Sequence, residues 1–353
     1  MKPQTENLAK GSDFSATLGR KPGFVWQAQS MLRSCQTEID VRTMSLADAA
    51  LLRLSQAISS VLLGKEHQVR LAVCCLLAGG HLLIEDRPGT GKSTLAEALA
   101  RGCSLSFKRV SFTSDLLPAD LIGINVFDPT TARFRFQPGP IFTQVLLADE
   151  INRASPRTQS ALLEAMAVGR VSVDGTTHLL PKPFLVIATQ NSLDQVGTSP
   201  LPEAQLDRFL MRLQLGSPAR EAERRLLLGE ACDLEGLETG LDAQQLLAWQ
   251  QDCRDQYCSD VLIDYVLDLI ESSRQKGVGL SPRASQAVLA AARAMSRVEQ
   301  RDYVTVDDVQ NVFAAVAEHR LDGGCPSDGG CFSDGQGRNP LSHALLKQVN
   351  ALR

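Results

Sequence analysis

The sequence predicts an α/β fold in which a parallel sheet, buried on both faces, precedes a smaller domain made of helices. Short apolar runs alternate with helical patterns in the first part of the chain, which is typical of a parallel sheet covered by helices. A glycine-rich turn joins the first of these runs to a helix. No strand pattern follows Ser217 and Pro218, so we place the boundary between the two domains there.

The period of the apolar residues gives the expected elements in chain order. Helices over 47–63 and 67–78 come first, because apolar residues recur there at helical spacing. The five strands of the sheet are expected at 81–85, 107–113, 145–149, 184–189 and 210–215. The remaining helices are expected over 93–101, 220–234, 243–251, 260–274, 282–297 and 306–319.

These elements divide the chain into four expected parts. Residues 1–45 are polar and lack a steady period, so we expect a poorly ordered N-terminal extension. Residues 46–216 form the α/β domain, and residues 217–320 form the helical domain. Residues 321–353 combine a glycine-rich loop with a short C-terminal helix over 341–352.

Length and composition exclude several classes of protein. The 353 residues suffice for two domains, and a hydrophobic fraction of 44% is typical of globular proteins. A net charge of −4 argues against a nucleic-acid-coating protein, and we expect no membrane span because no run of about 18 apolar residues occurs. Nine cysteines, an odd number, favour free thiols in a reducing compartment. Since residues 1–20 also lack the apolar segment of a secretory signal, we expect a cytoplasmic protein.

The strongest motif is a phosphate-binding pattern between the first strand and its helix. The glycines let successive N–H groups turn toward phosphate oxygens, Lys92 is expected to reach the β- and γ-phosphates, and Ser93 to bind Mg²⁺. The usual pattern has a glycine where this chain has Asp86, just before the part that surrounds the phosphates. We expect ATP to be bound by Asp86, Arg87, Pro88, Gly89, Thr90, Gly91, Lys92, Ser93 and Thr94.

Two acids end the apolar strand expected at 145–149. Such a strand delivers carboxylates to the ligand crevice at the carboxyl edge of the sheet. Asp149 is expected to hold Mg²⁺, and Glu150 to accept a proton from the attacking water. The alternative interpretation is a strand that ends in a solvated turn.

Polar residues also end the strand expected at 184–189. If this strand lies between the first strand and the acid-bearing strand, Asn191 lies between Lys92 and Glu150. Its amide could then orient the attacking water or contact the γ-phosphate. The alternative is an asparagine that caps the following turn.

These motifs resemble those of the MoxR branch of the AAA+ ATPases. Two further segments carry the resemblance, Leu206-Asp207-Arg208-Phe209 and Gly279-Leu280-Ser281-Pro282-Arg283-Ala284, and it extends over residues 55–319. It implies a P-loop AAA+ core with a five-stranded parallel sheet in the order 5-1-4-3-2, followed by a helical lid domain. It also implies ATP-hydrolysing hexameric chaperones that mature or activate partner complexes, often with a von Willebrand factor A domain protein.

The resemblance assigns roles to three more residues. Arg208 would be the arginine finger that serves the nucleotide of the neighbouring subunit, and the alternative is a surface ion pair between Asp207 and Arg208. Arg283 would be the second sensor of the γ-phosphate, and the alternative is an ordinary arginine at a helix start. Gly64 matches the family's turn near the adenine.

Two insertions are expected to form hairpins, over residues 123–142 and 170–178. The first contains Phe127, Phe134, Phe136 and Phe142. These aromatic side chains could face the central pore of a ring or could pack the hairpin itself, and the sequence does not decide between the two.

The function predicted from the sequence is that of an ATP-hydrolysing ring chaperone. One alternative is an ATP-gated interaction scaffold with little turnover. A second is a DNA-acting AAA+ ATPase, which the acidic balance and the absence of a basic stripe disfavour. Neither the client nor the partner protein can be read from the sequence.

Overall fold

The computed structural model describes residues 46–191, 199–237, 239–275, 279–321 and 340–350. The expected N-terminal extension and the segment 322–339 of the expected glycine-rich loop lie outside the described residues. The chain divides into two units, Met1–Ala49 and Ala50–Arg353, and the account below concerns the second. In the described part of the chain, no helix is long and apolar enough to cross a bilayer.

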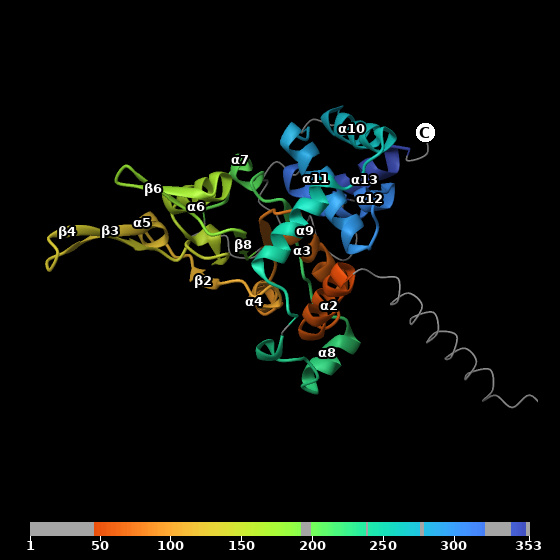
Figure 1. Cartoon of the computed structure of the whole chain (residues 1–353). Coiled ribbons are helices and arrows are strands. Elements are labelled where there is room, and N and C mark those ends of the chain that lie inside the picture. The colour runs from red at the N-terminus through yellow and green to blue at the C-terminus, as the bar shows by residue number, and fades with distance from the viewer. Residues whose placement is uncertain (1–45, 192–198, 238, 276–278, 322–339, 351–353) are drawn as a thin grey trace, which may run out of the picture. The chain divides into compact units, whose positions relative to one another are not determined.

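Five parallel strands form the central sheet (Figure 1). They are β1 (Leu82–Glu85), β2 (Phe107–Ser111), β5 (Val145–Asp149), β8 (Leu185–Gln190) and β9 (Met211–Leu213). Their order across the sheet is β2-β5-β8-β1-β9. With the five strands numbered in chain order, this is 5-1-4-3-2 read from the opposite edge, so the predicted sheet is confirmed. The carboxyl ends of β1, β8 and β5 therefore lie side by side.

Helices account for most of the remaining described chain. The α/β part contains α2 (Leu46–Val61), α3 (Glu66–Leu77), α4 (Lys92–Gly102), α5 (Pro118–Ile122), η1 (Ile151–Arg153), α6 (Pro156–Val168) and α7 (Glu203–Leu206). The helical part contains α8 (Arg220–Leu227), η2 (Leu234–Gly236), α9 (Ala243–Asp255), α10 (Asp260–Gln275), α11 (Pro282–Val298), α12 (Val306–Leu321) and α13 (Leu341–Gln348). A buried apolar cluster joins α6 to the sheet through Leu162, Leu146 and Val186.

The first helix of the helical part is shorter than expected. The apolar period predicts a helix over 220–234, but α8 ends at Leu227. Gly229 has φ +73°, and its N–H donates to the carbonyl of Leu226. The prediction of one longer helix was wrong because a glycine in the left-handed conformation ends a helix in this way.

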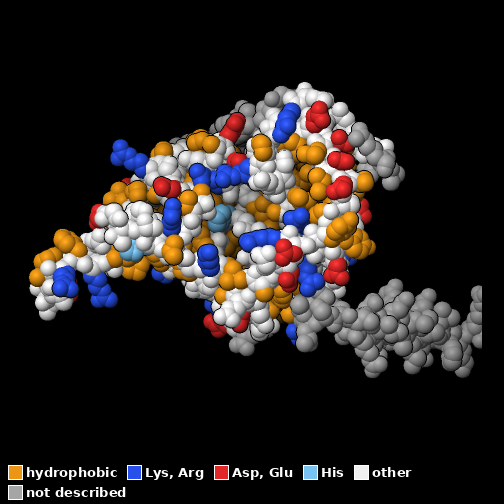
Figure 2. Space-filling view, turned by 45° about the horizontal axis from the view of Figure 1, so that its top comes forward, with side chains coloured by type: hydrophobic (Ala, Val, Ile, Leu, Met, Phe, Trp, Pro, Cys, Tyr) orange, Lys and Arg blue, Asp and Glu red, His pale blue; other side chains and the backbone are white. Residues whose placement is uncertain are grey.

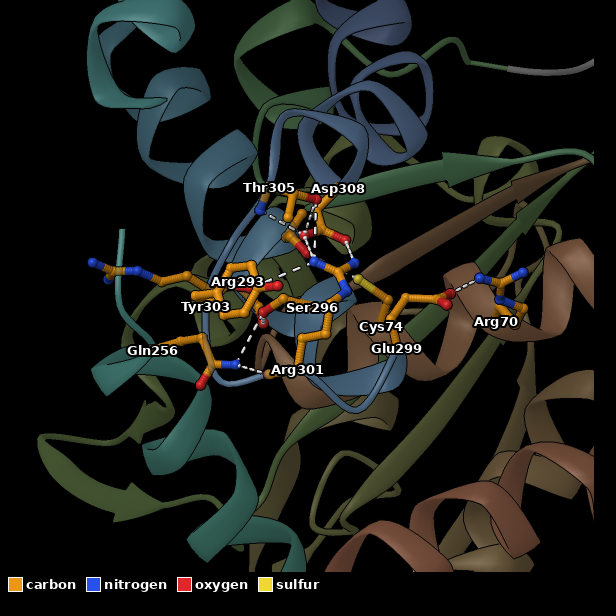
Figure 3. A network of polar contacts seen from close by, with 11 residues as sticks. Arg70, Cys74, Gln256, Arg293, Ser296, Glu299, Arg301, Tyr303, Thr305 and Asp308 are labelled. Carbon is orange, nitrogen blue, oxygen red and sulfur yellow. Dashed lines mark hydrogen bonds and ion pairs between the residues drawn. The ribbon is translucent and has the colours of Figure 1, made fainter. Parts of the chain in front are cut away.

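The helical part packs on the α/β part through α11, which contacts both α12 and α3. Alanine side chains on the buried face of α11 allow this close approach. The thiol of Cys74, on α3, donates a hydrogen bond of 3.1 Å to the carbonyl of Ala291 on α11. An ion pair between Arg70 and Glu299 lies nearby (Figure 3).

A buried ion pair fixes the start of α12 (Figure 3). Arg301 donates to both carboxylate oxygens of Asp308, at 2.8 and 2.5 Å. The N–H and hydroxyl of Thr305 donate to the same carboxylate, which is fully buried. The bond to Asp308 raises the pKa of Arg301. A buried carboxylate is stable only when its oxygens are compensated in this way.

Both expected hairpins are present. The first pairs β3 (Gly123–Asp128) with β4 (Arg133–Pro138), and the second pairs β6 (Arg170–Val173) with β7 (Thr176–Leu179). The amide of Asn125 donates to the carboxylate of Asp174 at 2.8 Å, which ties one hairpin to the other. Figure 1 shows both hairpins projecting from the α/β part, away from α10–α13.

His81, just before β1, is a neutral, half-buried imidazole. Its Nδ1 accepts a hydrogen bond of 3.0 Å from the N–H of Val186, and its Nε2 donates to the carbonyl of Met166 at 3.3 Å. A proton on Nδ1 would point at the N–H of Val186, which is itself a donor, so protonation would break this hydrogen bond. Burial lowers the pKa of His81 from 6.5 to about 4.

Stability is therefore expected to fall in mild acid. In the unfolded chain His81 binds a proton near pH 6.5, whereas the folded chain resists protonation until about pH 4. Acidification through this window should lower the contribution of His81 to the free energy of unfolding by up to about 3 kcal/mol. Burial also lowers the pKa of His319, so this second histidine adds a loss of the same sign. Denaturant titrations at several pH values measure this change. It should be smaller in His81→Asn and unchanged in a variant of the exposed His67; an equal change in all three chains would contradict the assignment.

Candidate active site

The loop after β1 has the backbone of an anion-binding turn. Gly89 and Gly91 have φ of +83° and +94°, which residues with a side chain rarely adopt. A Cβ added to Gly91 would lie 3.0 Å from the side chain of Leu62. Helix α4 begins directly after Gly91, so the first N–H groups of that helix have no carbonyl partner within it. Such a helix start attracts phosphate oxygens.

Lys92 is the first residue of α4, directly after this loop, and is only 8% exposed. Its Nζ donates to the carbonyls of Asp86 and Arg87, at 2.5 and 3.0 Å, and to Oδ1 of Asn191 at 3.0 Å. Burial lowers the pKa of Lys92, and the carboxylates of Asp86, Asp149 and Glu150 partly offset this effect.

Asn191 joins Lys92 to Glu150. Its Oδ1 accepts from Lys92, and its Nδ2 donates to Oε1 of Glu150 at 2.6 Å. Asn191 follows β8, which lies between β1 and β5 in the sheet, so the expected placement is the observed one. The amide is 8% exposed and uses both its oxygen and its nitrogen in this line.

The two acids are fixed by residues to which the sequence interpretation had given no role. The hydroxyl of Thr189, on β8, donates to Oδ1 of Asp149 at 2.6 Å and accepts from the N–H of Glu150 at 2.9 Å. Arg109, on β2, donates through Nε to Oδ2 of Asp149 at 3.1 Å. Arg153 forms an ion pair of 2.9 Å with Oε2 of Glu150.

Part of this arrangement could have been foreseen from the sequence. Thr189 is a polar residue at the end of an otherwise apolar strand, and Arg153 lies three residues after Glu150. Arg109 carried no such signal, because its approach to Asp149 depends on the pairing of β2 with β5. Glu150 itself has φ +59°, a conformation in which non-glycine residues are uncommon and often functional.

Asp86, which replaces the usual glycine, has a structural partner. Its Oδ1 accepts from the N–H of Arg87 at 2.7 Å, and its Oδ2 accepts from the N–H of Gly216 at 2.5 Å. Lys65 donates to the carbonyls of Leu215 and Gly216, at 2.6 and 2.9 Å. Asp86 and Lys65 together hold the segment that leads from β9 into the helical part.

Gly64 lies against α8, the helix that follows this segment. It has φ +72°, and a Cβ there would lie 2.6 Å from Cβ of Ala222 on α8. Both the conformation and the space require glycine at this position.

The other expected site residues are not hydrogen-bonded into the Lys92–Asn191–Glu150 line. Across the described residues, the side chains of Ser93, Thr94 and Arg208 make no hydrogen bond or ion pair. Arg283, at the start of α11, lies 3.8 Å from the carboxylate of Asp207, with 59% of its side chain exposed. Asp207 thus pairs with arginines of the helical part and not with Arg208.

Known proteins are similar to this chain in sequence and in fold. Residues 81–211 match the model of the ATPase family associated with various cellular activities (AAA), and residues 271–333 match that of the AAA lid domain. The chain is 38% identical to chaperone MoxR1 of Mycobacterium tuberculosis, over 75% of this chain and 73% of the relative. It is 33% identical to protein MoxR of Paracoccus denitrificans, over 75% of this chain and 86% of the relative.

The chain belongs to the MoxR family of AAA+ ATPases. A crystal structure from Cytophaga hutchinsonii, provisionally described as an ATPase, has the same fold, with a TM-score of 0.75 and 28% identity. The match covers 92% of this chain and 99% of that one. The predicted α/β core with a helical lid region is therefore confirmed for this member of the MoxR family.

In this MoxR-family chain, two phenylalanines of the first hairpin differ in their exposure, which the sequence did not predict. Phe134 is 72% exposed and forms an edge-to-face ring pair with Phe127, which is itself exposed. Phe136 is half-buried and stacks on His178 of the second hairpin, with ring centroids 3.9 Å apart. Hydrophobic and basic side chains gather at the end of the first hairpin in Figure 2. Arg133 and Arg135, the neighbours of Phe134 in the sequence, are exposed as well.

The two rings should respond differently to substitution. Phe136→Ser should lower the free energy of unfolding by about 1–2 kcal/mol, less than full burial would give, because it removes a stacked, half-buried ring. Phe134→Ser should change it by less than about 0.5 kcal/mol. Denaturant unfolding of the wild type and the two variants measures both changes in the free energy of unfolding. Equal losses would mean that Phe134 also packs within the hairpin.

Proposed function

We propose that this MoxR-type AAA+ ATPase hydrolyses ATP in a homo-hexameric ring and thereby remodels, matures or activates a partner protein complex. The proposal is carried by the hydrogen-bonded line from Lys92 through Asn191 to Glu150. This line brings a cation suited to phosphate, at the start of α4, together with an amide and a carboxylate at the ends of two neighbouring strands. That set of groups is suited to positioning a water molecule against a phosphoryl group.

The residues at these strand ends fit ATP and Mg²⁺. The left-handed Gly89 has open space where a Cβ would be, and the start of α4 presents free N–H groups beside Lys92. The hydroxyl of Ser93 and the carboxylate of Asp149 are oxygen ligands of the kind that Mg²⁺ prefers. The metal, when bound, supplies positive charge that stabilises the transferred phosphoryl group.

Each side chain then has one task. Lys92 neutralises phosphate oxygens, and Glu150 accepts the proton of the attacking water. Asn191 holds the Glu150 carboxylate at 2.6 Å and is placed to orient the water or to contact the γ-phosphate. Arg208 acts on the nucleotide of the next subunit, and Arg283 couples the helical lid to the γ-phosphate.

Partners and location are part of the same proposal. A relative described as a chaperone supports a client protein, and we propose a von Willebrand factor A domain protein as the partner. The exposed end of the first hairpin, around Phe134, is the surface we assign to partner contact. The six cysteines in the described part of the chain are free thiols, which supports a cytoplasmic location.

Substituting Glu150 and Lys92 tests the chemistry. Glu150→Gln should bind ATP but hydrolyse it at least ~100-fold more slowly, because Gln keeps an oxygen for Asn191 and loses the base. Lys92→Ala should instead lose ATP affinity, since Lys92 contacts phosphate before the reaction. ATP binding and phosphate release measure the two effects. Wild-type turnover by Glu150→Gln would show that another residue is the base, and negligible turnover by the wild type would favour the scaffold interpretation.

Mixing two inactive chains tests the assembly. Arg208→Ala should bind ATP yet hydrolyse it about 10³-fold more slowly, because its guanidinium serves the next subunit. Mixed with Lys92→Ala, which keeps Arg208, it should regain activity at junctions between an intact P-loop and an intact finger. The ATPase rate of the mixture is compared with the sum of the separate rates. No gain on mixing, with wild-type activity independent of protein concentration, would show that each subunit works alone.

A further inference from the structure

Arg320, near the end of α12, holds the turn that carries Arg208. Its side chain is 6% exposed. Its guanidinium donates to Oδ1 of Asp207 at 2.7 Å, to the carbonyl of Phe209 at 2.8 Å and to that of Leu210 at 3.3 Å. A single planar guanidinium can hold all these acceptors at once, whereas a lysine ammonium cannot match this geometry.

The residues on both sides of Arg208 are therefore fixed. Phe209 is fully buried, and the N–H of Leu210 donates to the carbonyl of His81 at 2.8 Å. Asp207 is held by Arg320. Arg208 itself is half-buried, and its side chain has no hydrogen-bond or ion-pair partner among the described residues. Its backbone is thus anchored while its guanidinium remains available to another molecule.

Asp207 also connects this turn to the start of α11. Its Oδ2 lies 3.8 Å from Arg283, while its Oδ1 accepts from Arg320. One carboxylate is thus shared by two arginines that lie on different helices of the lid. Burial lowers the pKa of Arg320, and the bond to Asp207 partly offsets this effect.

We propose that Arg320 and Asp207 are positioning residues that hold the turn of Arg208 so that its guanidinium reaches the nucleotide of the neighbouring subunit. The inference rests on the proposed role of Arg208. It adds that the orientation of the finger is set by the lid of its own subunit, through α12. Loss of either partner should then impair the neighbour's site and spare the chain's own.

The chain provides a matched control at the other end of the same helix. Arg301 pairs with the buried Asp308 near the start of α12 (Figure 3). Arg320 pairs in the same way with Asp207 near the end of α12. The Arg301 pair has no contact with residues 207–210 among the described contacts. Arg301→Gln therefore reports the effect of breaking a buried ion pair on α12 without touching the turn of Arg208.

The experiment compares Arg320→Gln, Asp207→Asn and Arg301→Gln in the full-length chain. We measure three quantities for each variant: the melting temperature, the affinity for a fluorescent ATP analogue and the ATPase rate per folded protein. The ATPase rate is measured for the variant alone and for its mixture with Lys92→Ala. Arg320→Gln and Asp207→Asn should keep their analogue affinity within about threefold of wild type and lose about 10- to 100-fold in turnover, because a misplaced catalytic group costs about that much. Mixing with Lys92→Ala should restore turnover in both. Arg301→Gln should melt earlier with turnover near that of wild type.

The outcomes separate this inference from the function on which it rests. If Arg208→Ala is not rescued by Lys92→Ala, the proposed catalysis between subunits fails. If Arg208→Ala is rescued but Arg320→Gln and Asp207→Asn are not, these residues support their own subunit's fold and the inference is overturned. Should Arg320→Gln not fold, Asp207→Asn decides alone, because it keeps the size of the side chain; wild-type turnover in that variant overturns the inference.

Discussion

The order of the strands is the constraint on which the candidate active site depends. Neighbouring strands lie about 4.8 Å apart, so groups two strands apart are separated by about 10 Å. Lys92 and Glu150 follow β1 and β5, which have β8 between them. The amide of Asn191, at the end of β8, fills this gap and bonds to both. A different strand order would leave the same three residues in the sequence without bringing them together.

Burial gives this line its electrostatic character. Lys92 is nearly excluded from water, and this burial lowers its pKa. The nearby carboxylates oppose that effect, and two of them, Asp149 and Glu150, are themselves paired with Arg109 and Arg153. Removing one member of such a network leaves the charges of its partners uncompensated. The resulting loss of stability is larger than the contribution of the single bond that was removed. Glutamine is therefore an informative replacement for Glu150, because it removes the charge and keeps the oxygen that accepts from Asn191.

The sequence predicted those features that have a local chemical signature. Periodicity identified the five strands, and the glycine pattern identified the loop that begins at Asp86. The end of α8 was missed because one glycine outweighed an apolar period that continued beyond it. The sequence also gave no reason to expect Arg320 beside Asp207, because these residues are 113 positions apart and meet only through the packing of α12.

The same limit applies to the two rings of the first hairpin. Phe134 and Phe136 alternate on one strand with Arg135 between them, so both point to the same face by strand periodicity. Their different exposure arises from the second hairpin, whose His178 covers Phe136 and does not reach Phe134. A pattern within one strand cannot contain that information, because the covering residue belongs to another insertion.

The short strand β9 connects the lid region to the nucleotide loop. Arg320 holds the turn before β9, whereas Asp86 and Lys65 hold the residues after it. The strand between these two attachments has only three residues, and it pairs along its whole length with β1. A strand of this length cannot absorb a displacement at one end without transmitting it to the other or breaking its pairing. Because β1 leads directly into the glycine loop before Lys92, the pairing of β9 with β1 joins the turn held by Arg320 to that loop within a single pair of strands.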